Sequence, residues 1–396
     1  MSPASPQGSL RHLPVSPPVE RIAILRALQL GDLLLTVPAL RAIRARFPAA
    51  EITLIGLPWA AELAQRLSRY VDRFVEFPGY PGIAEASYDE ERTARFFARQ
   101  CAYGYDLAIQ MHGNGTASNG FCRALGARMT VGCYDDTPPD GLTLGAPYPR
   151  DAHEIERNLA IARLLGCRPP SLDLEFPLRS ADTAEAARLL RRLARAPRPW
   201  IGLHPGARAS SRRWPAESFA RAGVLLARRF GATLILTGGT DERETASSVA
   251  ALLRTRTGVL RTPPPVDAHA CAPPSPRRER ESRGEVLLNL AGRTSLGGLA
   301  AVIARLDLYI SNDTGPAHLA DAVGTPSITL FGPADHRRWA PLDARLHPIL
   351  REPVSCSPCA FAVCPIDHRC LRRIGPEQVI EQAARLLETS VAACDA

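Results

Sequence analysis

The sequence contains no lysine. All 48 of its basic residues are arginine, against 40 acidic residues, and the formal net charge is +8. Any cationic side chain that contacts a phosphate must therefore present the forked guanidinium group. A modest basic excess suits anionic partners such as a phosphorylated glycolipid. The arginines are dispersed and no RNA- or DNA-binding motif accompanies them, so nucleic acid is not an expected partner.

Long hydrophobic runs are also lacking. No apolar run approaches the roughly 20 residues that a membrane-spanning helix needs. Residues 1–19 are rich in proline and serine, without the apolar segment of a signal peptide, and we interpret them as a disordered tail. We therefore expect a cytoplasmic protein, in which the ten cysteines stay reduced unless they bind a metal.

From residue 20 onward, strand-like and helix-like patterns alternate. The predicted strands are 21–26, 51–56, 72–77, 105–111 and 129–132. The predicted helices are 33–47, 60–67, 85–102, 116–125 and 153–165. Residues 135–149, rich in Pro, Gly and Asp, are predicted to form a loop. The alternation predicts a doubly wound parallel sheet that binds ligands at the carboxyl ends of its strands.

The same pattern restarts after a proline-rich boundary at 196–199. The predicted strands are 200–203, 233–237, 286–290, 306–310 and 327–331, with helices at 181–194, 215–230, 241–253, 296–304 and 317–323. We predict two doubly wound domains, 20–178 and 198–375, followed by a helix at 376–393. Residues 261–284 are of low complexity and are interpreted as a disordered insertion. Two such domains are expected to face a cleft in which a nucleotide donor meets an acceptor.

One turn in the second half has the features of an anion site. It joins the strand 306–310 to the helix 317–323 and contains Asp313, Thr314 and Gly315. Backbone N–H groups at a helix start, together with the helix dipole, favour a phosphate. Thr314 and His318 add a hydroxyl and an imidazole near the same point. The alternative is an ordinary helix start that is capped by Asp313.

A second turn of the same half carries a further group of anion-binding residue types. After 204–207, which includes Gly206, come Ser210, Ser211, Arg212 and Arg213, just before a helix that starts with proline. Hydroxyls and guanidinium groups over a helix start predict a second phosphate cradle. Glu242 follows a third turn, 238–239, where a carboxylate could hold ribose hydroxyls, although a plain helix-start acid fits equally well.

Asp32 lies at the first turn of the first predicted helix, next to Gly31. A glycosyl transfer that inverts the anomeric centre needs one base to take the proton from the attacking hydroxyl. The helix start keeps the carboxylate ionised and so able to accept that proton. The alternative for Asp32 is a helix cap with no other role.

Four cysteines, Cys356, Cys359, Cys364 and Cys370, lie close together near the end of the chain. Their number and the CxxC pair suit a structural Zn or Fe site. Reduced cysteines without a metal fit the wider spacing of the second pair equally well. A catalytic role is not expected, because nothing in the sequence places a base beside them.

Several motifs occur in a fixed order along the chain. They are Gly31-Asp32-Leu33-Leu34, Pro38-Ala39-Leu40, His204-Pro205-Gly206-Ala207, Arg213-Trp214-Pro215, the stretch 312–320, Gly324-Thr325-Pro326 and Leu330-Phe331-Gly332-Pro333. Together they resemble the heptosyltransferases of glycosyltransferase family 9, which build the inner core of lipopolysaccharide. The resemblance covers roughly residues 20 to 390 apart from the insertion at 261–284.

This resemblance implies a GT-B fold and an enzyme that takes heptose from ADP-heptose to a lipid-linked inner-core acceptor, at the cytoplasmic face of the inner membrane. The family's general base matches Asp32, and its ribose contact matches Glu242. Its phosphate contacts match Asp313, Thr314, Gly315, His318 and the 210–212 region. The family usually has lysine where this chain has Arg212, so donor affinity could differ. No metal is required for such a transfer.

Three alternatives stay open at the level of sequence. Similar cysteine clusters occur in family members that glycosylate proteins, so the acceptor could be a protein. GT-B folds also include sugar-nucleotide epimerases, in which the diphosphate leaves without transfer to another sugar. The last alternative is a binding or scaffold protein without activity, which the presence of Asp32 and of the phosphate turns disfavours.

Overall fold

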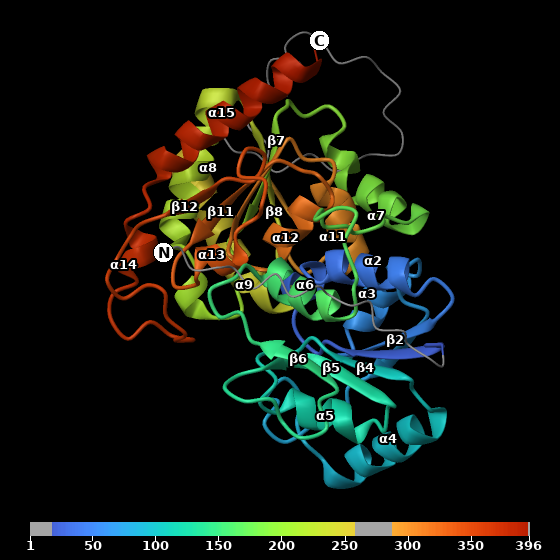
Figure 1. Ribbon diagram of the computed structural model, residues 1–396. Coiled ribbons are helices and arrows are strands. Elements are labelled where there is room, and N and C mark those ends of the chain that lie inside the picture. Colours follow the sequence, from blue (N-terminus) through green and yellow to red (C-terminus); the bar gives the residue numbers. More distant parts are fainter. Residues whose placement is uncertain (1–17, 258–286, 395–396) are drawn as a thin grey trace, which may run out of the picture. The chain divides into compact units, whose positions relative to one another are not determined.

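The computed structural model describes residues 18–257 and 287–394. The chain divides into two compact units, Met1–Asp173 and Leu174–Ala396. Each unit contains one parallel six-stranded sheet with helices packed against it (Figure 1). The predicted α/β class with two doubly wound domains is confirmed. The predicted disordered segments, 1–19 and 261–284, lie almost wholly outside the described residues.

The first sheet has the strand order β3-β2-β1-β4-β5-β6. The strands are β1 (Arg21–Leu25), β2 (Glu51–Gly56), β3 (Arg73–Glu76), β4 (Leu107–Gln110), β5 (Met129–Tyr134) and β6 (Leu144–Pro147). The central strands β1 and β4 are apolar and almost fully buried, as expected for a parallel sheet that is covered on both faces. Strand order reverses between β1 and β4, and such a reversal is where open α/β sheets bind ligands.

Two predictions for the first unit were wrong. The loop predicted at 135–149 contains the edge strand β6, whose half-exposed pattern and Pro147 resemble a loop in sequence but are tolerated at a sheet edge. The single helix predicted at 33–47 is two helices, α1 (Leu30–Leu34) and α2 (Val37–Arg46). The break coincides with Pro38, which has no N–H to continue the helical ladder.

The other helices of the first unit agree with the alternation. They are α3 (Ala60–Arg66), α4 (Glu90–Tyr103), α5 (Ser118–Ala124) and α6 (Glu154–Leu164). Helix α6 packs against α2, and this contact brings residues more than a hundred positions apart to the end of β1.

The second sheet repeats the topology of the first, with the order β12-β11-β10-β7-β8-β9. The strands are β7 (Trp200–His204), β8 (Thr233–Leu236), β9 (Leu287–Asn289), β10 (Leu308–Asn312), β11 (Ser327–Phe331) and β12 (Ile349–Arg351). The order reverses between β7 and β10, which pair in parallel from Leu308 opposite Ile201. The half-exposed edge strand β12 was not predicted, because it is only three residues long.

The helices of the second unit bury the apolar faces of that sheet. They are α7 (Ser180–Leu190), α8 (Ala216–Phe230), α9 (Arg243–Thr257), α11 (Leu296–Ile303), α12 (Gly315–Ala322), α13 (His336–Trp339), α14 (Arg369–Arg372) and α15 (Pro376–Cys394). Helix α7 packs on α11, and α15 packs on α8. Trp214 and Phe219 are buried in this core and pack edge to face against each other. Within the described ranges, none of the helices is both long and apolar enough to cross a membrane.

Candidate active site

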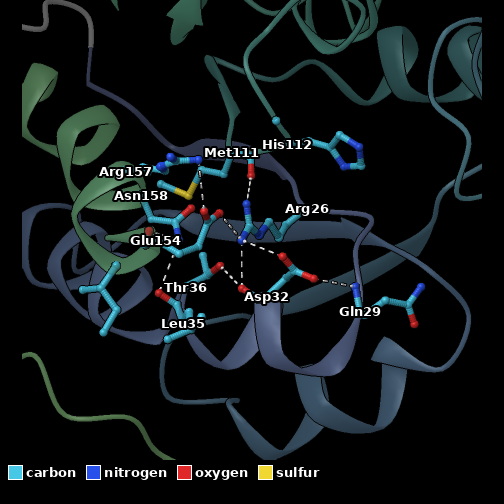
Figure 2. Close-up of polar contacts among 12 residues, drawn as sticks. Arg26, Gln29, Asp32, Leu35, Thr36, Met111, His112, Glu154, Arg157 and Asn158 are labelled. Atoms are coloured by element: carbon cyan, nitrogen blue, oxygen red, sulfur yellow. Dashed lines mark hydrogen bonds and ion pairs between the residues drawn. The ribbon is translucent and has the colours of Figure 1, made fainter. Parts of the chain in front are cut away.

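Asp32 lies in α1, just after the carboxyl end of β1 and beside the reversal of strand order in the first sheet. Its Oδ2 accepts a hydrogen bond from the Gln29 N–H at 3.3 Å, so the carboxylate does cap the helix start. Its Oδ1 lies 3.8 Å from Arg26 Nη2, and its side chain is 19% exposed (Figure 2). The capping contact therefore coexists with access from solvent, and the role of Asp32 as a base remains a prediction.

Arg26 fixes the backbone around Asp32. Its buried guanidinium donates from Nη1 to the Met111 carbonyl oxygen at the end of β4 and from Nη2 to the Asp32 carbonyl oxygen at 3.0 Å. Thr36 Oγ1 donates to the same carbonyl oxygen at 2.8 Å. Strands β1 and β4 and the α1–α2 junction are thus joined at one point (Figure 2).

A second carboxylate reaches this point from α6. Glu154 is 2% exposed, and its Oε1 accepts from Arg26 Nη2 at 2.9 Å. Its Oε2 lies 3.8 Å from Nη1 of the buried Arg157. Two guanidinium groups and two carboxylates therefore meet in one cluster, which keeps the buried charges paired. Arg26 and Glu154 were not predicted as site residues, because their separation of 128 positions carries no local pattern.

His112 follows β4 directly and was also given no role from sequence. Burial lowers its pKa to about 4, and the positive charge of Arg26 acts in the same direction. Glu85, whose Oε2 lies 3.5 Å from His112 Nε2, opposes this shift without cancelling it. The imidazole is therefore neutral at pH 7. Its position at the end of a central strand is the one sequence signal that could have identified it.

In the second unit, the buried amide of Asn312 joins two of the predicted turns. Its Nδ2 donates to the carbonyl oxygens of Pro205 and Gly206, each at 3.0 Å. Its Oδ1 accepts from the Trp214 N–H at 2.9 Å. The turn after β7, the start of α8 and the end of β10 are thereby held together. Asn312 was part of the family motif but was not predicted to have this role.

The structure brings Arg212 to the turn that precedes α12. Arg212 Nη1 lies 3.3 Å from Oδ2 of Asp313, which is 4% exposed. The N-cap of α12 is Thr314, so the alternative in which Asp313 caps this helix is wrong. Gly315 begins the helix, and His318 is buried within it. Since a carboxylate repels a phosphate, the contact of Asp313 with Arg212 suits it to orient that guanidinium beside the helix start.

The two predicted serines and Arg213 make internal contacts. Ser210 Oγ donates to the Ala362 carbonyl oxygen at 3.3 Å, and Ser211 Oγ donates to the Phe361 carbonyl oxygen at 2.6 Å. Both serines thus hold the loop that contains the four cysteines against the turn that contains residues 210–213. Arg213 Nε donates to the Ala207 carbonyl oxygen at 2.8 Å and braces the same turn. Their predicted contacts with a phosphate remain predictions.

Glu242 lies over the turn after β7. Its Oε2 accepts from the Gly239 N–H at 2.7 Å and is 3.4 Å from His204 Nε2. Burial raises the pKa of this carboxyl, but the contacts with His204 and Gly239 and the charge of Arg213 outweigh burial and hold the pKa below its ordinary value. A Cβ at Gly206 would stand 2.2 Å from Glu242 Oε1, so a larger residue there would displace this carboxylate.

The four predicted metal ligands lie between β12 and the end of α14. Cys370 is buried and the other three are half-buried. Burial raises the pKa of the Cys370 thiol. In the part of the chain that the structure describes, no group of three or more His, Cys, Asp or Glu side chains is arranged to hold a metal ion. The metal site therefore remains a prediction from the sequence, and no step of a reaction is assigned to it.

Comparison with known proteins identifies the family of this chain. The model of glycosyltransferase family 9 (heptosyltransferase) matches residues 93–262 and 273–369. This chain belongs to glycosyltransferase family 9. The resemblance predicted from its motifs is thereby confirmed, although the match does not test which residues bind the donor or remove the proton.

Curated relatives of this family 9 chain include two bacterial heptosyltransferases. Lipooligosaccharide heptosyltransferase 2 of Campylobacter jejuni is 28% identical over 192 residues, which cover 48% of this chain and 51% of that protein. Lipopolysaccharide heptosyltransferase 3 of Escherichia coli K12 is 25% identical over 324 residues, or 78% of this chain and 82% of that protein. The chain thus spans about half the length of the Campylobacter relative.

Solved structures of the family show the same fold. A family 9 glycosyltransferase from Veillonella parvula superimposes with a TM-score of 0.71 at 20% identity, over 93% of this chain and 98% of that one. The E. coli ADP-heptose lps heptosyltransferase II gives a TM-score of 0.67 at 20% identity, over 94% of this chain and 99% of that one. The predicted GT-B fold is confirmed for this family 9 chain.

Proposed function

We propose that this family 9 glycosyltransferase transfers heptose from ADP-heptose to a sugar hydroxyl of a lipid-linked lipopolysaccharide inner-core acceptor, with inversion at the anomeric carbon. Family membership and the names of the curated relatives support the sugar and the acceptor class. The observation that carries the proposal is the position of Asp32, a partly exposed carboxylate that is fixed where β1 and β4 diverge.

In the proposed step, an acceptor hydroxyl oxygen attacks the anomeric carbon of heptose and forms the new glycosidic bond. The bond between that carbon and the diphosphate oxygen breaks, and ADP leaves with the electron pair. The Asp32 carboxylate takes the hydroxyl proton. A positioned base of this kind accelerates such steps by about 10² to 10⁴-fold. Arg26 and Gln29 orient Asp32 so that little ordering is required when substrate arrives.

The second unit would bind the donor. Arg212 and the backbone N–H groups at the start of α12 offer positive charge to the diphosphate as it leaves. Glu242 offers a carboxylate to the ribose. This chemistry requires no metal ion. The acceptor would be a phosphorylated glycolipid at the cytoplasmic face of the inner membrane, which suits the net charge of +8.

A second candidate keeps the reaction and replaces the lipid-linked acceptor with a protein. It is favoured by the loop with Cys356, Cys359, Cys364 and Cys370. A structural neighbour with a TM-score of 0.53 and 12% identity is described as the iron-containing dodecameric glycosyltransferase TibC of enterotoxigenic E. coli. At that identity the likeness shows the fold alone, so the lipid-linked acceptor remains the first candidate.

The test is ADP release by the purified protein from ADP-heptose, with heptose-deficient lipopolysaccharide, with a polypeptide acceptor, and with neither. We expect release that depends on the lipopolysaccharide and a product of inverted anomeric configuration by NMR. Release without either acceptor would indicate hydrolysis or epimerase-like chemistry. Turnover only with another nucleotide sugar would overturn the assignment of heptose.

The role of the base is tested in the same assay with Asp32→Asn, which we expect to lower kcat by about 10² to 10⁴-fold. Asp89→Asn is the matched control, because Asp89 also caps a helix, α4, by accepting from the Arg92 N–H at 2.7 Å. If both variants lose activity equally, capping accounts for the effect and Asp32 is not the base.

A further inference from the structure

A chain of polar side chains under the proposed donor site takes no part in the reaction described above. It comprises Tyr309 in β10, Thr237 just after β8, and His204 at the end of β7. Their exposed fractions are 0%, 1% and 2%. Thr237 Oγ1 lies 2.9 Å from the Tyr309 hydroxyl and 3.1 Å from His204 Nδ1. Three buried polar groups are costly unless each has a hydrogen-bond partner.

The direction of these hydrogen bonds follows from Glu242, the carboxylate that His204 contacts. His204 Nε2 lies 3.4 Å from the Glu242 carboxylate, which only accepts, so Nε2 carries a proton. In the neutral imidazole, Nδ1 is then the acceptor. Thr237 must then donate to His204, and Tyr309 must donate to Thr237. Burial raises the pKa of the Tyr309 hydroxyl, which therefore keeps its proton. Tyr309 thus donates to Thr237, Thr237 donates to His204, and His204 donates to Glu242.

The two oxygens of Glu242 are used differently. Oε2 is held by the Gly239 N–H and by His204. Among the residues that the structure describes, none donates a hydrogen bond to Oε1, and the side chain is 14% exposed. An ionised carboxylate with one oxygen held and the other open is suited to accept from a ligand hydroxyl.

The open oxygen lies next to the proposed phosphate site. Gly206 packs against Glu242 Oε1, and its carbonyl oxygen accepts from Asn312, the residue before Asp313. A hydroxyl acceptor and an anion site on adjoining turns match the two ends of a ribose diphosphate, whose hydroxyls and phosphates are separated by one sugar ring. An acid placed only to start α9 would not require this buried support.

We propose that Tyr309, Thr237 and His204 are positioning residues, which we call the ribose relay, and that they fix Glu242 for a ribose hydroxyl of the bound nucleotide. This inference rests on the proposed function only in requiring a ribonucleoside diphosphate as the leaving group. The relay touches no reacting atom. Its effect is on donor affinity and on the discrimination of ribose from deoxyribose.

Calorimetric titration of the full-length protein tests the relay, with ADP, 2′-deoxy-ADP and 3′-deoxy-ADP as ligands. The variant His204→Leu removes the donor to Glu242. We expect it to bind ADP about tenfold more weakly, as for a hydrogen bond to a charged group. Its affinity for the analogue without the contacted hydroxyl should change by less than about twofold. Thr237→Val and Tyr309→Phe should have the same pattern, with progressively smaller losses.

Two further variants separate positioning from stability. His204→Gln keeps an N–H donor and should recover part of the ribose preference. Thr233→Val is the matched control, because Thr233 is a buried threonine at the start of β8, and its hydroxyl donates to the Pro197 carbonyl oxygen at 2.7 Å. It should lower thermal stability about as much as Thr237→Val and leave the ribose preference unchanged.

The outcomes distinguish the relay from the proposed function. If His204→Leu loses affinity equally for ADP and for both deoxy analogues, the role is structural and the relay is overturned while the function stands. If GDP or UDP binds more tightly than ADP, the donor assignment is wrong. The ribose relay is then tested by comparing that nucleotide with its own deoxy analogues in His204→Leu. If none of the three diphosphates binds, both proposals are overturned.

Discussion

The two candidate regions are built on the same sheet topology but are held by different forces. In the first unit, charged side chains surround the turn that contains Asp32, where Arg26 and Arg157 contact Glu154 and Asp32. In the second unit, a neutral amide, Asn312, ties the donor turns together through three hydrogen bonds. Paired charges orient the proposed base without adding net charge. The neutral Asn312 amide adds no charge to the second site, so the positive potential there remains available to a diphosphate.

The sharpest test of this contrast is to remove one charge from the first region. Glu154→Gln removes the buried carboxylate that Arg26 and Arg157 share. We expect the free energy of unfolding to fall by about 3–5 kcal/mol, the cost of breaking a buried ion pair. Urea denaturation measures it. Glu156→Gln, on the exposed side of α6, is the control and should change little. An equal, small loss in both variants would mean that the buried cluster is not held by charge.

The first region should also respond to pH. The neutral form of His112 is favoured in the folded protein, where the pKa is about 4 against 6.5 in the unfolded chain. The unfolded state therefore binds the extra proton, and stability falls as pH drops from about 6.5 to about 4. The His112 contribution amounts to about 3 kcal/mol at most.

Urea denaturation between pH 4 and pH 7 compares the protein with His112→Asn. Burial also lowers the pKa of His347 to about 4, and this histidine remains in the variant. His112 and His347 should contribute about equally to the stability lost at low pH, so their joint contribution should be about half as large in the variant. An unchanged pH dependence would contradict the neutral state of His112.

In the second region, Asn312→Ala should destabilise the protein by about 2 kcal/mol, because two carbonyl oxygens and one N–H lose their buried partner. It should also weaken ADP binding, since both donor turns depend on it. Asn119→Ala is a matched control in the first unit, where the buried Asn119 amide donates to the Cys133 carbonyl oxygen at 2.8 Å. Calorimetry should show ADP affinity unchanged in this control. Unchanged ADP affinity in Asn312→Ala would mean that the Asn312 amide plays no part in donor binding.

The smallest effect on stability is expected at Arg212, whose side chain is 43% exposed. Arg212→Ala should change the free energy of unfolding by less than about 1 kcal/mol but lower ADP affinity about tenfold, the equivalent of one lost charged contact. Arg212→Lys should retain part of that affinity, because it keeps the charge and loses the fork. Arg208→Ala, exposed on the same turn, should leave affinity unchanged. Equal losses at Arg208 and Arg212 would indicate a general effect of charge.

Much of the fold could be predicted because the signals are local. The strands 21–26 and 327–331 are apolar runs between turn residues, and the helices between them have apolar positions at helical spacing. The edge strands β6 and β12 were missed, since short, half-exposed strands depend on a neighbouring strand for their hydrogen bonds. Pro38 also marked a helix break that the periodic pattern of 33–47 concealed.

The candidate site divides in the same way. Asp32, Arg212 and the 313–315 turn could be proposed from sequence, because each follows a strand and precedes a helix. The supporting residues could not. Glu154 approaches Arg26 only through the packing of α6 on α2, and Tyr309 reaches His204 only because β10 pairs with β7. These contacts leave no periodicity or spacing in the chain.

From the sequence alone come the doubly wound class, the family motifs and the residue types that precede each helix, because strand, turn and helix signals act over a few neighbouring residues. Only the tertiary structure decided which distant charges surround Asp32, that Asn312 joins the donor turns, and that one oxygen of Glu242 is left open. The physical reason is that hydrogen bonds and ion pairs depend on distances of a few ångströms between atoms. Sheet order and helix packing set those distances.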